Sequence, residues 1–268
     1  MNDNLLFAFI LTLFAGLSTG IGSAFAIFTK KTNRTFLSFS LGFSAGVMIY
    51  VSFVEIFQKA RVSLINVFGS QYGEVYTVLA FFGGILIILI IDALIPSAEN
   101  PHEIHFVEEI SQEELKNKKL LRMGSLTAIA IAIHNFPEGL ATFTAALTDP
   151  SIGVPIAVAI AIHNIPEGIA VSIPIYYATG NKKKAFWYSF SSGLAEPIGA
   201  IIGFLILRQY FNDVTFGILF AAVGGIMVFI SIDELIPTAR EYDSGHKSIY
   251  GFILGMLVMA ISLLLFKI

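Results

Sequence analysis

Apolar residues along the chain gather into eight runs that are separated by mostly short polar connections. The runs lie at about 5–28, 36–58, 75–96, 123–147, 152–178, 185–207, 214–237 and 248–267. A helix of about 20 predominantly apolar residues spans the hydrocarbon core of a bilayer, so each run is predicted to be a transmembrane helix. The pattern predicts an all-α integral membrane protein whose residues 1–268 form a single polytopic domain.

One connection, 97–122, is long and polar. It contains His102, His105 and a run of Glu. We interpret it as a cytoplasmic loop, either partly disordered or forming a short amphipathic helix. Its His and Glu side chains could bind metal weakly, but a solvated polar loop is the favoured interpretation, and the same holds for His246 in the last such connection.

The overall composition supports a membrane protein. Of the 268 residues, 56% are hydrophobic and only 13% are charged, and the mean hydropathy is +0.79, far from the composition of soluble domains. The chain contains no Cys, which excludes disulfides and thiolate chemistry. We expect membrane lipid as a partner and no nucleic acid.

The distribution of basic residues predicts the orientation in the membrane. Twelve of the sixteen Lys and Arg residues fall in alternate connections, and four in the other set. Because cytoplasmic loops carry the excess of Lys and Arg, both termini are predicted to lie outside the cytoplasm. The larger set comprises Lys30, Lys31, Arg34, Lys116, Lys118, Lys119, Arg122, Lys182, Lys183, Lys184, Arg240 and Lys247.

An internal repeat relates the two ends of the chain. Residues 45–56 align without gaps on 224–235, and residues 16–22 align on 193–199. Spans one to three therefore match spans six to eight, and because equivalent spans are five apart in the order, an odd number, the second copy is inverted. Inverted repeats are typical of secondary transporters, so the predicted architecture is three plus two plus three spans. The glycine pairs Gly16/Gly20, Gly42/Gly46, Gly199/Gly203 and Gly251/Gly255 predict close helix approach.

Spans four and five are themselves related by one motif, His-Asn-x-Pro-Glu-Gly, at 134–139 and again 29 positions later at 163–168. Within each helix the His, Asn and Glu share one face. The Pro is predicted to break or kink the helix and to free a carbonyl one turn back, which a membrane tolerates beside a polar cavity. Ionisable groups at bilayer depth cost roughly 2.5–3.5 kcal/mol or more, so they call for compensation.

Two such faces turned towards each other would form a site of imidazole nitrogens and carboxylate oxygens. That set suits Zn²⁺, Fe²⁺, Mn²⁺ or Co²⁺ and disfavours Cu⁺. The alternative is that each His and Glu merely satisfies the other inside the bundle. Glu196, followed by Pro197, repeats the acid-plus-Pro theme in span six and is a further candidate ligand, while its repeat counterpart is Thr19.

Four more carboxylates and one thioether are candidates for a pathway to and from this site. Glu55 is placed near the outer end of span two and its repeat mate Glu234 near the inner end of span seven, where they would either relay a cation or serve as interfacial carboxylates. Asp92 and Asp233 lie beside the predicted inner mouth and favour a structural role. On sequence alone Met48 favours core packing over thioether ligation.

The paired motifs in adjacent central helices of an eight-span chain resemble the ZIP (Zrt/Irt-like) divalent metal transporters, especially their bacterial ZupT-like branch. The resemblance implies uptake of Zn²⁺, often with Fe²⁺, Mn²⁺, Co²⁺ or Cd²⁺, into the cytoplasm, by an elevator-like movement and commonly in a homodimer. It implies no prosthetic group. Together with the richness in Ile, Phe and Lys, it places the protein in a bacterial plasma (inner) membrane.

The resemblance also implies a binuclear centre between spans four and five. The first metal would be held by His134, Glu138, His163 and Glu167, with Met48 adjoining. The second would use Asn135, Asn164 and Glu196 and share Glu138 and Glu167. The near-symmetric pair of motifs departs from many relatives, in which the second motif begins with other residues, and this leaves the preferred metal open.

Three other functions remain as alternatives. An intramembrane di-metal enzyme would need several His boxes or several Glu-x-x-His pairs, and a zinc protease would need His-Glu-x-x-His. The sequence has neither a repeated set of such pairs nor His-Glu-x-x-His, so we expect no enzyme. A metal-selective channel would lack saturable kinetics, and the inverted repeat favours a carrier over it. A metal sensor would not need transmembrane helices interrupted by Pro.

Overall fold

The computed structural model describes residues 2–28, 34–94, 113–207, 209–210, 212–241, 243 and 245–265. Within these ranges the chain is helical and contains no strand. The helices are α1 (Asn2–Phe28), α2 (Arg34–Val51), η1 (Ser52–Ile56), α3 (Phe57–Leu94), α4 (Glu113–Thr148), α5 (Pro150–Thr179), α6 (Lys182–Gly193), α7 (Ala195–Leu207), α8 (Asp213–Ile230), η4 (Ser231–Leu235), α9 (Ile236–Glu241) and α10 (Lys247–Leu265).

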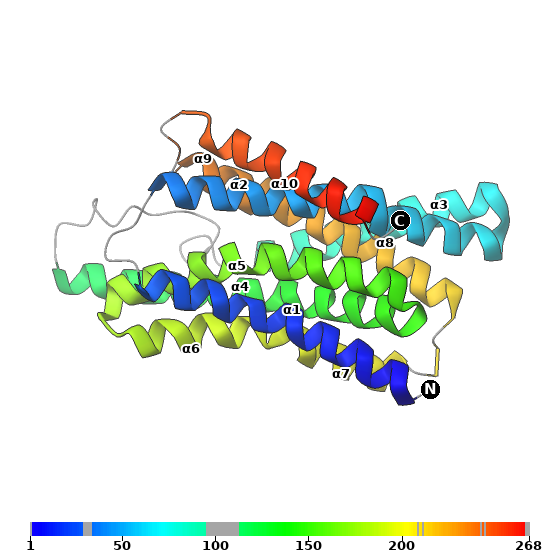
Figure 1. Cartoon of the computed structure of the whole chain (residues 1–268), viewed down its shortest axis with the longest axis horizontal. Coiled ribbons are helices and arrows are strands. Elements are labelled where there is room, and N and C mark those ends of the chain that lie inside the picture. The colour runs from blue at the N-terminus through cyan, green and yellow to red at the C-terminus, as the bar shows by residue number, and fades with distance from the viewer. Residues whose placement is uncertain are drawn as a thin grey trace.

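The helices form two bundles that lie side by side along the long axis of the molecule (Figure 1). One bundle contains α1, α4, α5, α6 and α7, and the other contains α2, α3, α8, α9 and α10. They meet mainly where α2 packs on α5 and where α4 packs on α8. Both termini lie at the same end of the molecule.

Six segments of the described chain are long and apolar enough to cross a membrane. One of them, Ser38–Ile91, has 54 residues and doubles back at Gly69, whose φ of 77° and ψ of 168° interrupt α3. A Cβ on Gly73 would lie 2.5 Å from Cα of Ile65, and Arg61 forms an ion pair with Glu74 across the turn. This segment therefore contains two antiparallel helical legs.

The helical legs extend beyond the apolar runs predicted from the sequence. Helix continues past residue 58 as far as the turn because Ala60 and Leu64 are fully buried, with the Leu64 side chain packed against Gly217 of α8. Helix α4 likewise begins at Glu113, inside the predicted 97–122 loop. The remainder of that loop, with His102 and His105, lies outside the described residues.

Of the break or kink predicted at proline, the break does not occur in spans four and five. Helices α4 and α5 run through Pro137 and Pro166 without interruption. A proline removes one hydrogen bond of the helical ladder, and close packing on both sides keeps the flanking turns helical. Span six does divide, at Leu194, into α6 and α7 just before Glu196 and Pro197.

Polar side chains cap several helices at the connections. Asp149 accepts a hydrogen bond from the Ser151 amide at the start of α5, and hydrogen bonding from the Ser151 side chain and then from this amide lowers the pKa of Asp149. Asn181 and Asn212 cap α6 and α8 in the same way. Before α10, hydrogen bonds from the Ser248 hydroxyl and neighbouring backbone amides lower the pKa of Asp243 to about 2. Such caps satisfy the amides that a helix leaves unpaired at its first turn.

Glycines let helices touch backbone to backbone, as their spacing predicts. A Cβ on Gly46 of α2 would lie 2.1 Å from the Phe252 carbonyl oxygen of α10, and one on Gly255 of α10 would lie 2.1 Å from that of Phe43. Helices α3 and α8 meet in the same manner. In the repeat, α2 (span two) corresponds to α8 (span seven), and α10 (span eight) corresponds to the second leg of α3 (span three). The α2–α10 pair and the α3–α8 pair are therefore equivalent.

A π-helical turn occurs at the same place in both repeats. The turns are Ser52–Ile56 and Ser231–Leu235, which the sequence repeat aligns residue for residue. Each begins with a buried Ser whose hydroxyl donates to a Met carbonyl one turn earlier, Ser52 to Met48 at 2.6 Å and Ser231 to Met227 at 2.7 Å. π-turns are rare and frequently lie at functional sites.

The neighbouring glycines of α3 test the importance of backbone contact. A Cβ on Gly84 would lie 2.0 Å from the Ala222 carbonyl oxygen, whereas one on Gly83 would meet nothing within 4 Å. We expect Gly84→Ala to destabilise the fold by about 1–3 kcal/mol through overpacking and Gly83→Ala to be neutral or stabilising. Thermal unfolding in detergent checks this, and equal melting temperatures for the two variants would contradict it.

Candidate metal centre

Six of the predicted ligands form a fully buried polar cluster in the first bundle. Each is at most 1% exposed, although the surrounding helices are apolar. They come from α4, α5 and α7: Asn135, Glu138, His163, Asn164, Glu167 and Glu196. His134 lies in α4, but its side chain is outside the described part of the structure.

The motif faces of α4 and α5 are turned towards each other. His163 Nε2 lies 3.2 Å from Glu138 Oε2, which joins an imidazole of one motif to a carboxylate of the other. The pairing brings nitrogen and oxygen donors into contact in the core of the bundle, which fits both the metal site and the alternative in which a His and a Glu satisfy each other. Both donor types bind borderline divalent metals.

The two motif Asn residues are anchored to backbone carbonyls of the flanking helices. Asn164 Nδ2 donates to the Ala15 carbonyl of α1 at 2.9 Å, and Asn135 Nδ2 donates to the Ser192 carbonyl of α6 at 3.3 Å. Ala15 and Ser192 occupy equivalent positions of the sequence repeat, so these contacts are symmetric. Asn164 also donates to Glu196 Oε1, which ties the centre to α7.

Glycines next to the ligands permit this close approach. A Cβ on Gly22 of α1 would lie 1.8 Å from the Ile165 carbonyl oxygen of α5, and one on Gly199 of α7 would lie 2.2 Å from that of Phe136 in α4. Gly139, next to Glu138, packs in the same way on the backbone of Glu196. The motif glycines are therefore needed for packing.

Three oxygens of the cluster have no hydrogen-bond partner among the described residues. They are Asn135 Oδ1, Asn164 Oδ1 and Glu196 Oε2. Buried polar atoms are nearly always paired, so an orphaned group needs an explanation, and a site for a bound ion is one of the usual ones. Among the described side chains, no three His, Asp or Glu residues have the geometry of a formed metal site.

Helix α2 of the second bundle reaches the centre. The Ser44 hydroxyl donates to the His163 carbonyl at 3.4 Å, and Met48 lies one turn further along α2, fully buried. Met48 is packed within the main hydrophobic core, as its sequence context favours. The sequence analysis did not single out Ser44.

The predicted pathway carboxylates differ in their surroundings. Glu55 is buried, with its carboxylate 3.7 Å from Lys59 Nζ, and it lies in the π-turn of the first repeat. Glu234 is half-buried and Asp233 exposed, both in the second π-turn. Asp92 lies in the last turn of α3, and its side chain is outside the described residues.

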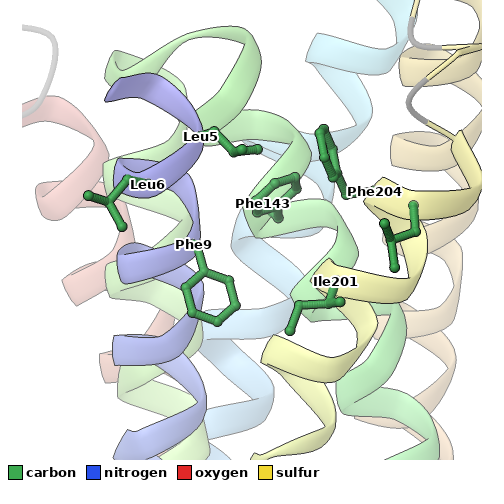
Figure 2. Close-up of a pocket in the computed structure, with 7 residues that line it drawn as sticks. Leu5, Leu6, Phe9, Phe143, Ile201 and Phe204 are labelled. Carbon is green, nitrogen blue, oxygen red and sulfur yellow. The ribbon is translucent and has the colours of Figure 1, made fainter. Parts of the chain in front are cut away.

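An apolar pocket between α1, α4 and α7 is separate from this cluster (Figure 2). Its volume is about 310 Å³. All of its lining residues are apolar, and none is a predicted ligand: Leu5, Leu6, Phe9, Phe143, Ile201, Phe204 and Leu205. Its chemistry suits hydrocarbon and offers a cation no donor.

Comparison with known proteins agrees with the paired motifs and the helical bundle. A family model described as "ZIP Zinc transporter" matches residues 4–263. The chain belongs to the ZIP family. It is 65% identical to the zinc transporter ZupT of Streptococcus mutans, over 99% of this chain and 100% of that protein. It is 61% identical to the ZupT of Clostridium perfringens, over 98% of this chain and 97% of that protein.

Membership of the ZIP family confirms the resemblance drawn from the motifs. Together with the apolar helices, it identifies this ZIP protein as a multi-pass membrane protein. The sequence analysis missed the backbone partners of the Asn residues, Ala15 and Ser192. A backbone carbonyl is present in every residue, so the sequence does not show which carbonyl an Asn will contact. The signal available was that Ala15 and Ser192 are equivalent in the internal repeat.

The Asn164 amide provides a stability test of the cluster. Asn164→Leu keeps the size of the side chain but removes the amide that donates to Ala15 and Glu196. Glu196 Oε1 then stays buried without the hydrogen bond from Asn164. We expect a loss of about 1–3 kcal/mol, measured by thermal unfolding in detergent. Asn66→Leu, at an exposed position of α3, is the control; a similar loss in both variants would contradict the assignment.

Proposed function

We propose that this ZIP protein carries Zn²⁺, and less selectively Fe²⁺, Mn²⁺, Co²⁺ and Cd²⁺, across a bacterial plasma membrane into the cytoplasm. The observation that carries the proposal is the set of orphaned oxygens beside the His163–Glu138 contact, buried in an apolar bundle. The relatives with 61% and 65% identity are named zinc transporters. A divalent cation compensates carboxylates that are otherwise costly at membrane depth.

The ligands fall into two sets around a binuclear centre. His134, Glu138, His163 and Glu167 bind the first ion, with Met48 adjoining. The second ion uses the orphaned oxygens of Asn135, Asn164 and Glu196 and shares Glu138 and Glu167. The donor set contains no thiolate, so binding is weak enough for the ion to leave, as transport requires.

The proposed topology has eight spans in the inverted three-plus-two-plus-three order. Two features support eight crossings in place of six. Ser38–Ile91 contains two antiparallel legs, and α4 runs alongside α5 although its polar first turns lower its mean hydropathy. Termini at one end of the molecule agree with an even number (Figure 1), and the basic connections place that end outside the cytoplasm.

Transport proceeds by movement of one bundle against the other. Every predicted ligand except Met48 lies in the bundle of α1, α4, α5, α6 and α7, so the ion can travel with that bundle as a body while α2, α3, α8, α9 and α10 stay in place. The equivalent contacts α2–α5 and α4–α8 form the interface. This arrangement supports an elevator-type mechanism of alternating access.

The two π-turns present carboxylates at opposite ends of the route. Glu55 on the outer side attracts the hydrated ion, the His and Glu ligands replace part of its water, and Glu234 receives it on the inner side. The ligands must be deprotonated to bind metal, so capture weakens at low pH. Asp233 and Asp92 lie beside the inner mouth.

Uptake of radioactive Zn²⁺ into proteoliposomes tests the function. Native protein should show saturable uptake with competition by Cd²⁺, Mn²⁺ and Fe²⁺, and Glu138→Ala with Glu167→Ala should abolish it because both ions lose shared ligands. Glu74→Ala, at an exposed position of α3, is the control and should transport normally. Native protein that binds Zn²⁺ but moves none would overturn the carrier assignment.

The π-turn carboxylates make a separate prediction. Glu55→Gln removes the charge of the outer π-turn while keeping its size, and should raise the KM for Zn²⁺ with little change in maximal rate, because it acts on capture. Glu74→Gln, in the same segment Ser38–Ile91, serves as the matched control. Unchanged KM in Glu55→Gln at low ionic strength would show that the carboxylate lies off the pathway.

A further inference from the structure

Thr19 is an exception among the buried hydroxyls of the helices. Most donate to a carbonyl one turn earlier in their own helix, as Thr12 does to Ala8 at 2.9 Å and Thr142 does to Glu138 at 2.9 Å. Thr19 is fully buried, yet its Oγ1 has no partner among the described residues. A buried hydroxyl without a partner is unusual and needs a local cause.

The cause is that the usual acceptor is already occupied. The carbonyl one turn before Thr19 is that of Ala15, which accepts from Asn164 Nδ2 at 2.9 Å and from the Ser18 hydroxyl at 2.6 Å. Within helix α1 this carbonyl also accepts the backbone N–H of Thr19, so three donors already share its two lone pairs and none is left for the Thr19 hydroxyl. The motif Asn thus takes the acceptor that the Thr19 hydroxyl would otherwise use.

Thr19 lies next to the buried polar cluster. A Cβ on Gly168, the residue after Glu167, would lie 2.1 Å from the Thr19 carbonyl oxygen. A Cβ on Gly193 would lie 2.7 Å from Thr19 Oγ1, which places the hydroxyl between α1 and α6. These contacts put the orphaned hydroxyl at the junction of α1, α5 and α6.

The internal repeat identifies the group that Thr19 faces. Thr19 is equivalent to Glu196, and Asn164 is equivalent to Asn135. Glu196 contacts Asn164 on its side of the centre, so Thr19 belongs on the side of Asn135, whose Oδ1 also has no partner among the described residues. The hydroxyl of Thr is at the γ position, whereas the carboxylate of Glu is at the ε position. The shorter Thr19 side chain therefore ends short of the Asn135 amide.

We propose that Thr19 Oγ1 and Asn135 Oδ1 form a neutral, oxygen-only half-site that contacts the transported cation opposite Glu196. The inference rests on the proposed transport function and adds a residue to it. Both donors are uncharged oxygens, so the half-site helps oxygen-preferring ions such as Mn²⁺ more than Zn²⁺. Thr19 is therefore a residue that sets metal selectivity.

Three variants test the half-site. Thr19→Val removes the hydroxyl and keeps the shape, Thr19→Ser keeps the hydroxyl, and Thr12→Val removes a buried hydroxyl of the same helix that already has a backbone partner. Binding of Mn²⁺ and Zn²⁺ to purified protein is measured by titration calorimetry, and uptake of both ions is measured in proteoliposomes. Melting temperatures monitor folding.

We expect Thr19→Val to weaken Mn²⁺ binding roughly 10-fold or more, the scale of losing one supporting group at a metal site, and Zn²⁺ binding less. Thr19→Ser and Thr12→Val should keep the native ratio of the two affinities. Native affinities and a native ratio in Thr19→Val would overturn the half-site while leaving transport intact. If Thr19→Val does not fold, Thr19→Ala decides by the same ratio. Native protein that binds neither ion would instead refute the proposed function.

Discussion

Backbone-to-backbone contact at glycine is the constraint on which the polar centre depends. The Asn side chains are short, and they reach the carbonyls of Ala15 in α1 and Ser192 in α6 while α1 touches α5 at Gly22 and α7, which follows α6 directly, touches α4 at Gly199. Any side chain at these glycines would separate the helices and detach the amides from their acceptors. With the helices at contact distance, the amides are fixed and their oxygens remain available to a cation. The glycines that end the two motifs, Gly139 and Gly168, meet the Glu196 and Thr19 carbonyl oxygens in the same way, so packing and placement of the polar side chains are one requirement.

The repeat builds a nearly symmetric frame, and one position breaks the symmetry. Equivalent residues anchor the two amides, and equivalent π-turns follow Met48 and Met227. Glu196, however, has Thr19 as its counterpart, so the third carboxylate of the centre lies on one side only. Like charges buried together raise each other's cost of ionisation. The buried cluster therefore carries its third carboxylate at Glu196 and a neutral hydroxyl at the equivalent position, Thr19, within a nearly symmetric frame.

The helical class is predicted well from the sequence, and the candidate donor residues can be named from it, because both leave local signals. Apolar runs of spanning length, the repeat and the doubled motif need no knowledge of packing. The continuation of α4 through Pro137 could not be predicted, since the loss of one ladder bond is offset by neighbours distant in sequence. The helical extension to Gly69 was missed because its buried side, at Ala60 and Leu64, is matched only by α8. No residue composition distinguishes a π-turn from an ordinary α-helical turn. The only indication of these two is that they lie at equivalent positions of the repeat.

The location of the ligands within one bundle bears on how an ion could be released. Three of the helices that fix Asn135, Asn164 and Glu196, namely α4, α5 and α7, pack on α1 in the same bundle, so rigid movement of that bundle leaves their mutual distances unchanged. The contact with α2 is different: Ser44 meets the His163 carbonyl at 3.4 Å, and Met48 lies one turn beyond it. Under the proposed elevator movement, sliding along α2 separates Met48 from the centre while the other donors remain. The Met48 thioether would then adjoin the ion in only one position of the moving bundle. Its separation after translocation lowers the affinity for the ion and favours release.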